Sequence, residues 1–395
     1  MNKPLSNLTF SLTDRNRFSL KLSMLNFCIA VSGDKWAEAL SCDLFSTLQY
    51  SKSNMAYHVY LTISAEDRVA RYGMDEATGA LTHQADFKIE GYPASIAVNP
   101  DQTLLCVARR ETLCLTSYRR DPVSGDLTEI SSVPTPADAC YQAIDKTGRF
   151  LFSVFYLGAR VMVHRISPDG VLDPEPATNL ETAIGAHCMQ TDASNRFTFV
   201  PHVANVERGG VNTIMQFKFD AETGTLTPND PFEEKPDPGV GPRHYVFHPT
   251  LDVVYFSNEQ GSSVSTYAFD RDEGTLTFMD LQSTLPADFN EFSKCAQLRL
   301  TPDARYLYVA NRGHDSLAGF RTDPETGRLT PLGQTPSHDF PRVMDIDPNG
   351  RFILSAGFHD GKMSVFRIGD DGSLENTATY DVGEEPMWIS ILPAG

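Results

Sequence analysis

The sequence predicts an all-β fold, a seven-bladed β-propeller of four-stranded antiparallel blades in which the C-terminal strand pairs into the N-terminal blade. Three observations carry this prediction. A turn motif occurs seven times, aromatic-rich strand segments recur about 50 residues apart, and the end of the chain supplies a strand that the first repeat lacks. The composition, 41% hydrophobic and 21% charged, is ordinary for a globular protein, so the prediction depends on spacing.

The repeated turn has the form Asp-x-x-x-Gly-x-Leu. Full copies lie at Asp75–Leu81, Asp121–Leu127, Asp220–Leu226, Asp270–Leu276 and Asp323–Leu329, and shortened copies at Asp169–Leu172 and Asp370–Leu374. Asp, Ser and Thr side chains bond the local backbone and Gly accepts a positive φ, so each copy predicts a hairpin turn. One turn type at regular intervals indicates an array of identical supersecondary units.

Each unit contains four segments with the pattern of strands. In the fifth unit they cover 242–249, 253–259, 263–269 and 276–280, where apolar residues alternate and β-branched and aromatic residues are enriched. The second strands of six units begin at Leu104, Phe150, Phe197, Val253, Tyr306 and Phe352. The longer intervals predict loop insertions at Val206–Gly210, Asn229–Gly239 and Ala287–Ser293.

The two ends of the array predict that it closes into a ring. The first unit begins at His58–Ile63, a second strand with no first strand before it. After the last unit, Pro386–Pro393 repeats the first-strand pattern of Pro93–Pro100, Pro242–Pro249 and Pro341–Pro348. Pairing of these segments would remove the exposed strand edges of an open array. The missing and the leftover strand argue against the alternatives, an open β-solenoid or paired sandwiches.

Residues 1–54 carry no repeat element, and we expect an N-terminal extension that is poorly ordered or an upstream start, followed by the propeller at 55–395. A decorating element packed on the propeller is the alternative. Leu22–Ser32 loosely resembles the apolar region of a signal peptide, but Asn26 interrupts it and no convincing cleavage site follows. No run approaches the length of a membrane span.

The net charge and the cysteine content indicate which partners the protein can have and which cellular compartment it occupies. The net charge is −18, which argues against nucleic acid as a partner because phosphate backbones need a basic face. The seven Cys are odd in number and have no CxxC spacing, so we expect reduced thiols in a cytoplasmic protein. We expect a monomer or weak homodimer that binds a small anionic substrate and no membrane.

Polar residues gather at one mouth of the predicted central channel. One repeat position near the start of the inner strand holds Ala94, Cys140, His187, Arg243, Ala296, Arg342 and Met387, and one at the end of the second strand holds Arg110, Tyr156, Val203, Glu259, Arg312 and Phe358. Antiparallel neighbours bring these two positions to the same rim.

These residue types indicate acid–base chemistry on an anion. Arginines around a concavity hold carboxylate or phosphate, and Glu and His move protons near neutral pH. Arg342 as a solvated rim charge, and Arg312 with His314 as an interblade network, are the structural alternatives. Carboxylates and His do not cluster at metal-ligand spacing, and no Gly-rich phosphate loop or Ser nucleophile elbow occurs.

Four motifs in this order resemble the seven-bladed lactonase family, which includes propeller-type 6-phosphogluconolactonases and fungal 3-carboxymuconate lactonising enzymes. They are Ala186-His187, Gly241–His244 with Asn258-Glu259, Gln297–Arg299 and Tyr308–Ser316, and the resemblance covers about 56–395. It implies His187, Glu259, Arg243 and Arg299 as catalytic residues, without a metal or cofactor. We further expect His244, Asn258, Arg312, His314 and Arg342 to bind substrate. The chain departs from the family pattern at Val343-Met344, Gly357-Phe358 and Phe155-Tyr156.

The resemblance leads us to expect hydrolysis of a sugar δ-lactone, 6-phosphogluconolactone first of all. Glu259 or His187 would activate water, the other would protonate the departing ring oxygen, and Arg243 and Arg299 would hold the anionic group and the oxyanion. A 3-carboxy-cis,cis-muconate cycloisomerase and a non-catalytic binding propeller are the two alternatives.

Overall fold

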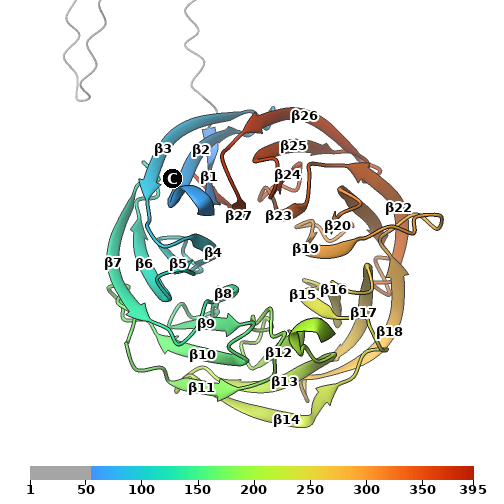
Figure 1. Ribbon diagram of the computed structural model, residues 1–395, viewed down its shortest axis with the longest axis horizontal. Helices are drawn as coiled ribbons and strands as arrows, with labels where there is room; N and C mark the ends of the chain where they lie inside the picture. Colours follow the sequence, from blue (N-terminus) through green and yellow to red (C-terminus); the bar gives the residue numbers. More distant parts are fainter. Residues whose placement is uncertain (1–54) are drawn as a thin grey trace, which may run out of the picture. The chain divides into compact units, whose positions relative to one another are not determined.

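The computed structural model describes residues 55–395, so the expectation for residues 1–54 lies outside the described part. These residues form seven antiparallel sheets set around a central axis (Figure 1). Six of the sheets have four strands and one has three. From the axis outwards the strands follow sequence order, except in the first blade, where the order is β27-β1-β2-β3. The predicted seven-bladed propeller is confirmed.

The strands of the first four blades have the following bounds. Blade 1 contains β27 (Pro386–Pro393), β1 (Met55–Ile63), β2 (Arg68–Asp75) and β3 (Leu81–Lys88); blade 2 contains β4 (Pro93–Val98), β5 (Leu104–Arg109), β6 (Cys114–Arg120) and β7 (Leu127–Pro134). Blade 3 contains β8 (Tyr141–Ile144), β9 (Phe150–Phe155), β10 (Arg160–Arg165) and β11 (Thr178–Glu181); blade 4 contains β12 (Phe197–His202), β13 (Thr213–Asp220) and β14 (Thr225–Glu234).

The remaining three blades are regular. Blade 5 contains β15 (Pro242–Phe247), β16 (Val253–Asn258), β17 (Ser263–Asp270) and β18 (Thr275–Ser283); blade 6 contains β19 (Lys294–Leu300), β20 (Tyr306–Arg312), β21 (Ser316–Thr322) and β22 (Leu329–Pro336); blade 7 contains β23 (Pro341–Ile346), β24 (Phe352–Gly357), β25 (Lys362–Ile368) and β26 (Leu374–Asp381). Two short 3₁₀ helices are η1 (Ser64–Glu66) and η2 (Val206–Arg208). No helix in the described part is long and apolar enough to cross a membrane.

The predicted turns form by the expected mechanism. In the copy that begins at Asp323, the carboxylate accepts hydrogen bonds from the backbone N–H groups of Glu325 (3.0 Å) and Thr326 (2.8 Å). Gly327 then adopts a φ of +69°, a conformation that side-chain-bearing residues disfavour. The same Asp-to-backbone bonding recurs at Asp75, Asp121, Asp220 and Asp270.

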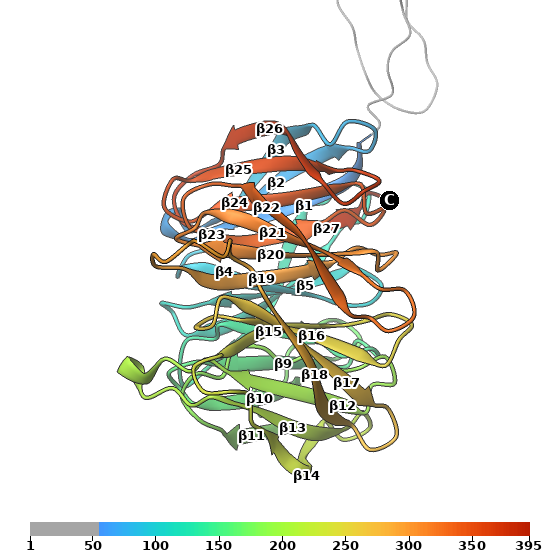
Figure 2. The same cartoon turned by 90° about the vertical axis from the view of Figure 1, so that its right-hand side faces the viewer.

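Ring closure follows the predicted route. β27 pairs antiparallel with β1 from Tyr57 opposite Pro393 to Thr62 opposite Trp388. The backbone N–H of Ala394 adds a bond to the carbonyl of Ala56 at 2.8 Å. Figure 2 shows the chain end at one face of the ring, while η2, part of a predicted insertion, projects from the opposite face.

Blade 4 departs from the predicted four strands because a side chain from blade 5 enters it. Only two isolated bridges, Ala186 with His202 and Thr191 with Thr198, connect its inner segment to β12. Between them the Tyr245 hydroxyl accepts hydrogen bonds from the backbone N–H groups of Gln190 (2.8 Å) and Phe199 (3.2 Å). This hydroxyl replaces ladder bonds, so the inner segment lies beside β12 without pairing continuously with it.

Bulges in the inner strands direct side chains into the channel. Pro242 pairs with Asn258 and His244 with Ser257, which leaves Arg243 as the extra residue of a β-bulge. Arg342 is the extra residue of the equivalent bulge in blade 7. A bulge interrupts the alternation of a strand and re-aims a side chain. As a result, Arg243 and His244, although adjacent in sequence, both line the channel.

Candidate active site

Six of the seven residues of the first predicted ring, together with Arg110 of the second, line a small cavity in the channel. Its lining residues are Ala94, Ser95, Arg110, Cys140, His187, Arg243, His244, Gln297, Arg342, Val343, Met387 and Trp388. The cavity volume is about 20 Å³, enough for one water molecule or one substrate oxygen. A larger substrate would therefore lie towards the mouth and extend only a small group inwards.

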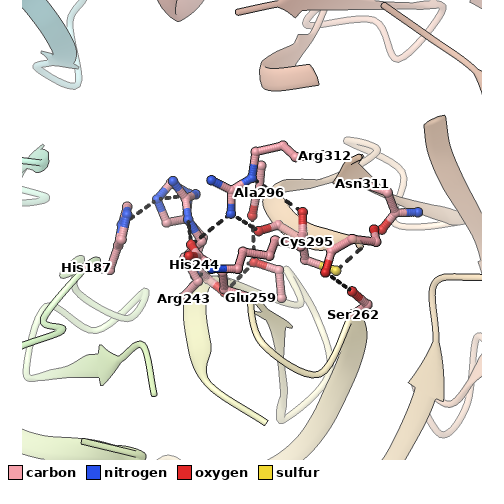
Figure 3. Close-up of polar contacts among 12 residues, drawn as sticks. His187, Arg243, His244, Glu259, Ser262, Cys295, Ala296, Asn311 and Arg312 are labelled. Carbon is pink, nitrogen blue, oxygen red and sulfur yellow. Dashed lines mark hydrogen bonds and ion pairs between the residues drawn. The ribbon is translucent and has the colours of Figure 1, made fainter. Parts of the chain in front are cut away.

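Glu259 is held between two guanidinium groups (Figure 3). Its Oε2 lies 2.8 Å from Arg243 Nε and 2.8 Å from Arg312 Nη2, and all three residues are buried. Burial alone would raise the pKa of this carboxyl, but the charges of Arg312 and Arg243 outweigh it and hold the pKa well below its usual range. Glu259 is therefore an anion at neutral pH and a weak base.

Two histidines extend this cluster across the channel (Figure 3). Arg243 Nη1 lies 3.2 Å from His244 Nε2, and the same Nε2 lies 3.2 Å from His187 Nδ1. Burial, followed by the charge of Arg243, lowers the pKa of both His187 and His244 well below 6.5. Both imidazoles are therefore neutral at physiological pH, and each has one ring nitrogen that carries no proton.

Arg342 faces the cavity as a cation without a counter-charge. Among the described residues no carboxylate lies within ion-pair distance of its guanidinium, which lies 5.5 Å from the ring centre of Phe358. Burial and the charges of Arg243 and Arg312 lower the pKa of Arg342 to about 9, so it stays protonated at neutral pH. Its donors are free to bind an anionic ligand.

The cluster is positive in a protein with a net charge of −18. Its cations are Arg110, Arg243, Arg312 and Arg342, and its carboxylates are Glu259 and Asp138, the latter bonded to Arg110. Four positive charges minus two negative charges leave a balance of +2. A buried positive balance at low dielectric attracts anions more strongly than the same charges would at the surface.

Arg299 is not part of this cluster. It lies two residues beyond the cavity-lining Gln297 on β19, roughly 7 Å further along the channel. There its Nε bonds Asp345 at 2.9 Å. The structure thus places the predicted catalytic Arg299 in an ion pair away from Glu259, because the strand alternation returns it to the channel one level deeper.

Two predicted substrate-binding residues have structural partners instead. Asn258 is buried and donates from Nδ2 to Ser263 Oγ (3.0 Å) and Ser265 Oγ (2.8 Å), within its own blade. His314 lies in the loop after β20, where its Nδ1 is 2.7 Å from Ser316 Oγ. Neither side chain lines the cavity. The Asn258 position reflects the repeat, in which Asn311 makes the equivalent bond to Ser316.

Aromatic residues support the two histidines, and of these the sequence had placed only Tyr156 at the channel mouth. The Tyr141 and Trp388 rings contact His244 with ring centres 5.2 and 6.4 Å away, and Tyr156 lies edge-on to His187 at 5.9 Å. Tyr141 and Trp388 each come one residue after a member of the first ring, Cys140 and Met387. Extending the alignment of the repeats by one residue would therefore have identified both.

Two chemistries find little support in the described residues. Burial raises the pKa of the cavity-lining Cys140 to about 12, so its thiol stays protonated and is a poor nucleophile. Within 55–395, no group of three or more His, Cys, Asp or Glu side chains is placed to hold a metal ion. What remains is a water-sized cavity lined by neutral imidazoles and guanidinium groups, an arrangement suited to polar addition at a carbonyl group.

The fold is a seven-bladed propeller with a cluster of arginines and histidines at one mouth of its channel. A family model described as lactonase, 7-bladed beta-propeller, matches residues 51–137 and 128–391. The chain therefore belongs to the seven-bladed β-propeller lactonase family.

Relatives and a solved structure agree with this membership. The chain is 33% identical over 317 residues to the 6-phosphogluconolactonase of Pectobacterium carotovorum, covering 80% of this chain and 93% of that protein. It is 30% identical over 335 residues to the enzyme of the same name from Serratia proteamaculans, covering 85% and 98%. The structure of the periplasmic gluconolactonase of Pseudomonas aeruginosa superimposes with a TM-score of 0.76 at 24% identity, covering 86% and 99%, a likeness of fold.

Proposed function

We propose that this protein hydrolyses a sugar δ-lactone that carries an anionic group, with 6-phosphogluconolactone as the substrate. The observation that carries the proposal is the positive cluster of Arg243, Arg312 and Arg342 beside two neutral imidazoles at one mouth of the channel. Two relatives named 6-phosphogluconolactonase, which this chain matches over nearly their whole length, support this substrate.

His187 is the general base in this proposal. A neutral imidazole takes a proton from water while the oxygen of that water adds to the lactone carbonyl carbon. The protonated His187 then returns the proton to the ring oxygen as the bond between that oxygen and the carbonyl carbon breaks. The product is the open-chain hydroxy acid, and the enzyme regains its starting protonation state.

Glu259 acts through the arginines and not as the base. Its Oε2 is held by two guanidinium groups and its side chain does not line the cavity, whereas that of His187 does. Its charge instead fixes the position of Arg243, whose Nη2 makes no hydrogen bond to the described residues and is available to the developing oxyanion. Arg342 binds the anionic group of the substrate, since it has no counter-charge of its own.

The activity is tested by following loss of 6-phosphogluconolactone above its spontaneous opening, with glucono-δ-lactone as the uncharged comparison. Arg342→Gln should raise KM for the phosphorylated lactone about 10- to 100-fold, the worth of one charge-assisted hydrogen-bond pair, and change KM for the uncharged lactone little. Arg351→Gln, on an exposed turn of the same blade, is the matched control. Rates with a chelator should equal those without it. Absence of enzyme-dependent turnover of either lactone would refute the proposal.

We extend the proposal to the part of the chain that is needed for catalysis, to the location of the protein and to its oligomeric state. Residues 55–395 are the catalytic unit, and a variant beginning at Met55 should keep the full turnover number. The thiols of Cys106, Cys114, Cys140, Cys188 and Cys295 are all free, which supports a reducing, cytoplasmic location. We propose a monomer or weak homodimer, which light scattering at several protein concentrations distinguishes from a stable oligomer.

A further inference from the structure

We propose that His244 is a positioning residue for the lactonase reaction: it accepts the Nδ1 proton of His187 and so presents the Nε2 lone pair of His187 as the base. This inference rests on the proposed function for its chemistry. The arrangement of protons that it requires is a property of the resting protein and can be measured without turnover.

The first step is the direction of the bond between Arg243 and His244. Arg243 Nη1 lies 3.2 Å from His244 Nε2. A guanidinium group has only donors, so His244 Nε2 must be the acceptor and carries no proton. A neutral imidazole has one N–H, and His244 therefore holds its proton on Nδ1.

The second step transfers this assignment to His187. His187 Nδ1 lies 3.2 Å from the same His244 Nε2, with the ring centres 4.9 Å apart. Since Nε2 of His244 carries no proton, the contact is a hydrogen bond only if His187 donates from Nδ1. Neutral His187 then has its lone pair on Nε2, the nitrogen that a general base needs.

The surroundings hold His244 neutral and in place. The charged groups that act on it are Arg243, Arg299 and Arg342, all cations, which disfavour a further positive charge on the ring. Tyr141 meets the ring edge-on and Trp388 lies against it at a tilt, and the side chain is 3% exposed. His244 is therefore neutral and fixed in place, so it can serve as the hydrogen-bond acceptor for His187.

This role differs from the substrate binding that the sequence led us to expect for His244. Its single Nε2 lone pair is already shared between two donors from the protein, so this atom has none left for a ligand. Orientation of a base by a third group is a recurring arrangement in hydrolytic sites. Here that group is an imidazole polarised by a buried guanidinium.

The test combines histidine-selective ¹⁵N NMR with kinetics on the full chain. In the wild type, we expect proton couplings that identify His187 as protonated on Nδ1, with the resonance assigned by its loss in His187→Gln. His244→Phe keeps the ring shape but removes the acceptor, and His187 should then become a mixture of tautomers. His244→Gln supplies an amide oxygen as acceptor and should keep the Nδ1–H form.

Turnover should follow the tautomer. With 6-phosphogluconolactone we expect kcat to fall about 10²-fold in His244→Phe, within the range contributed by a general base, while KM changes less than about threefold. His244→Gln should stay within about tenfold of the wild type. His83→Gln, on the exposed strand β3, is the control with unchanged values.

Two results would overturn the inference. One is wild-type His187 protonated on Nε2, which is measurable even if His244→Phe fails to fold or if the protein has no lactonase activity. The other is a folded His244→Phe variant with wild-type kcat. Failure of the proposed function itself would show differently, as absent turnover in the wild type with the predicted tautomer intact.

Discussion

Glu259 illustrates how neighbouring charges decide the role of a residue. A buried carboxylate with no partner would tend to be protonated, yet here two guanidinium groups keep it ionised. In return it supplies the only carboxylate within ion-pair distance of Arg243 and Arg312 among the described residues. Its contribution is to neutralise and orient these arginines, and the proton transfer falls to an imidazole.

Glu259→Gln should therefore affect stability as well as rate. Removal of one partner leaves buried cations without compensation, a change that costs about 3–5 kcal/mol in unfolding free energy. Because the amide no longer holds Arg243 firmly, we also expect kcat to fall about 10²-fold, as for loss of an oxyanion donor. Denaturant unfolding and lactone hydrolysis measure the two effects. Hydrolysis at the wild-type rate would remove Glu259 from any role in the reaction.

At the scale of the strand, the Tyr245 hydroxyl couples blade 5 to the segment that carries His187. It lies between the inner segment of blade 4 and β12, bonded to Gln190 and Phe199 in place of the regular ladder. The backbone N–H of His187 keeps one bond to Pro201 at 3.1 Å. The position of the proposed base is thus set partly by a side chain from the neighbouring blade.

Tyr245→Phe should separate this role from ordinary packing. Loss of the hydroxyl leaves two buried backbone N–H groups without partners, which should cost about 1–3 kcal/mol, and a shift of the inner segment should lower kcat about tenfold. The matched control is Tyr255→Phe, since the Tyr255 hydroxyl is also buried and donates to the Gly327 carbonyl at 2.6 Å, at a blade contact remote from the cavity. It should lose stability and keep kcat. Equal kcat in both variants would contradict the coupling.

At the scale of the whole molecule, several buried imidazoles make the stability of the propeller depend on pH. Burial lowers the pKa of His58, His164 and His202 to about 4, and for His58 the charge of Arg120 adds to this effect. The ring nitrogens of His164 and His202 have no hydrogen-bond partner among the described residues. These side chains fold in the neutral form, whereas in the unfolded chain they protonate near pH 6.5.

Stability should fall as the solution becomes acidic. Because the folded pKa values lie below the unfolded value, this contribution is complete above about pH 6.5 and is lost as the pH drops towards about 4. Between about pH 6.5 and 5, each fully buried histidine should lose about 2 kcal/mol. Urea unfolding at pH 7 and pH 5 measures the difference.

His202→Asn tests this origin directly. Asn258 and Asn311 occupy the equivalent positions of blades 5 and 6 and bond the hydroxyl opposite them, and Thr213 lies opposite His202. The variant should therefore fold, and its loss of stability between pH 7 and 5 should be smaller than that of the wild type. His83→Asn, at an exposed position, should leave the loss unchanged. An identical acid loss in His202→Asn would assign the effect to other groups.

The fold was predictable because its determinants are local and repeated. Each Asp…Gly turn forms from bonds within a few residues, so seven copies identify seven blades without knowledge of what packs between them. The strand missing before His58 and the one left over at Trp388 likewise identify the closure. The positions of His187, Arg243, Glu259, Arg312 and Arg342 at one mouth follow from the same register.

Contacts between blades were decided only in three dimensions. Strand spacing alone did not reveal that Arg299 is ion-paired with Asp345, that the Tyr245 hydroxyl replaces ladder bonds in blade 4, or that His187 and His244 are hydrogen-bonded to each other. Repetition along a chain predicts the strands and turns that each unit forms. Which side chains from different units come within bonding distance, and hence which groups stay charged, depends on how the ring packs around its axis.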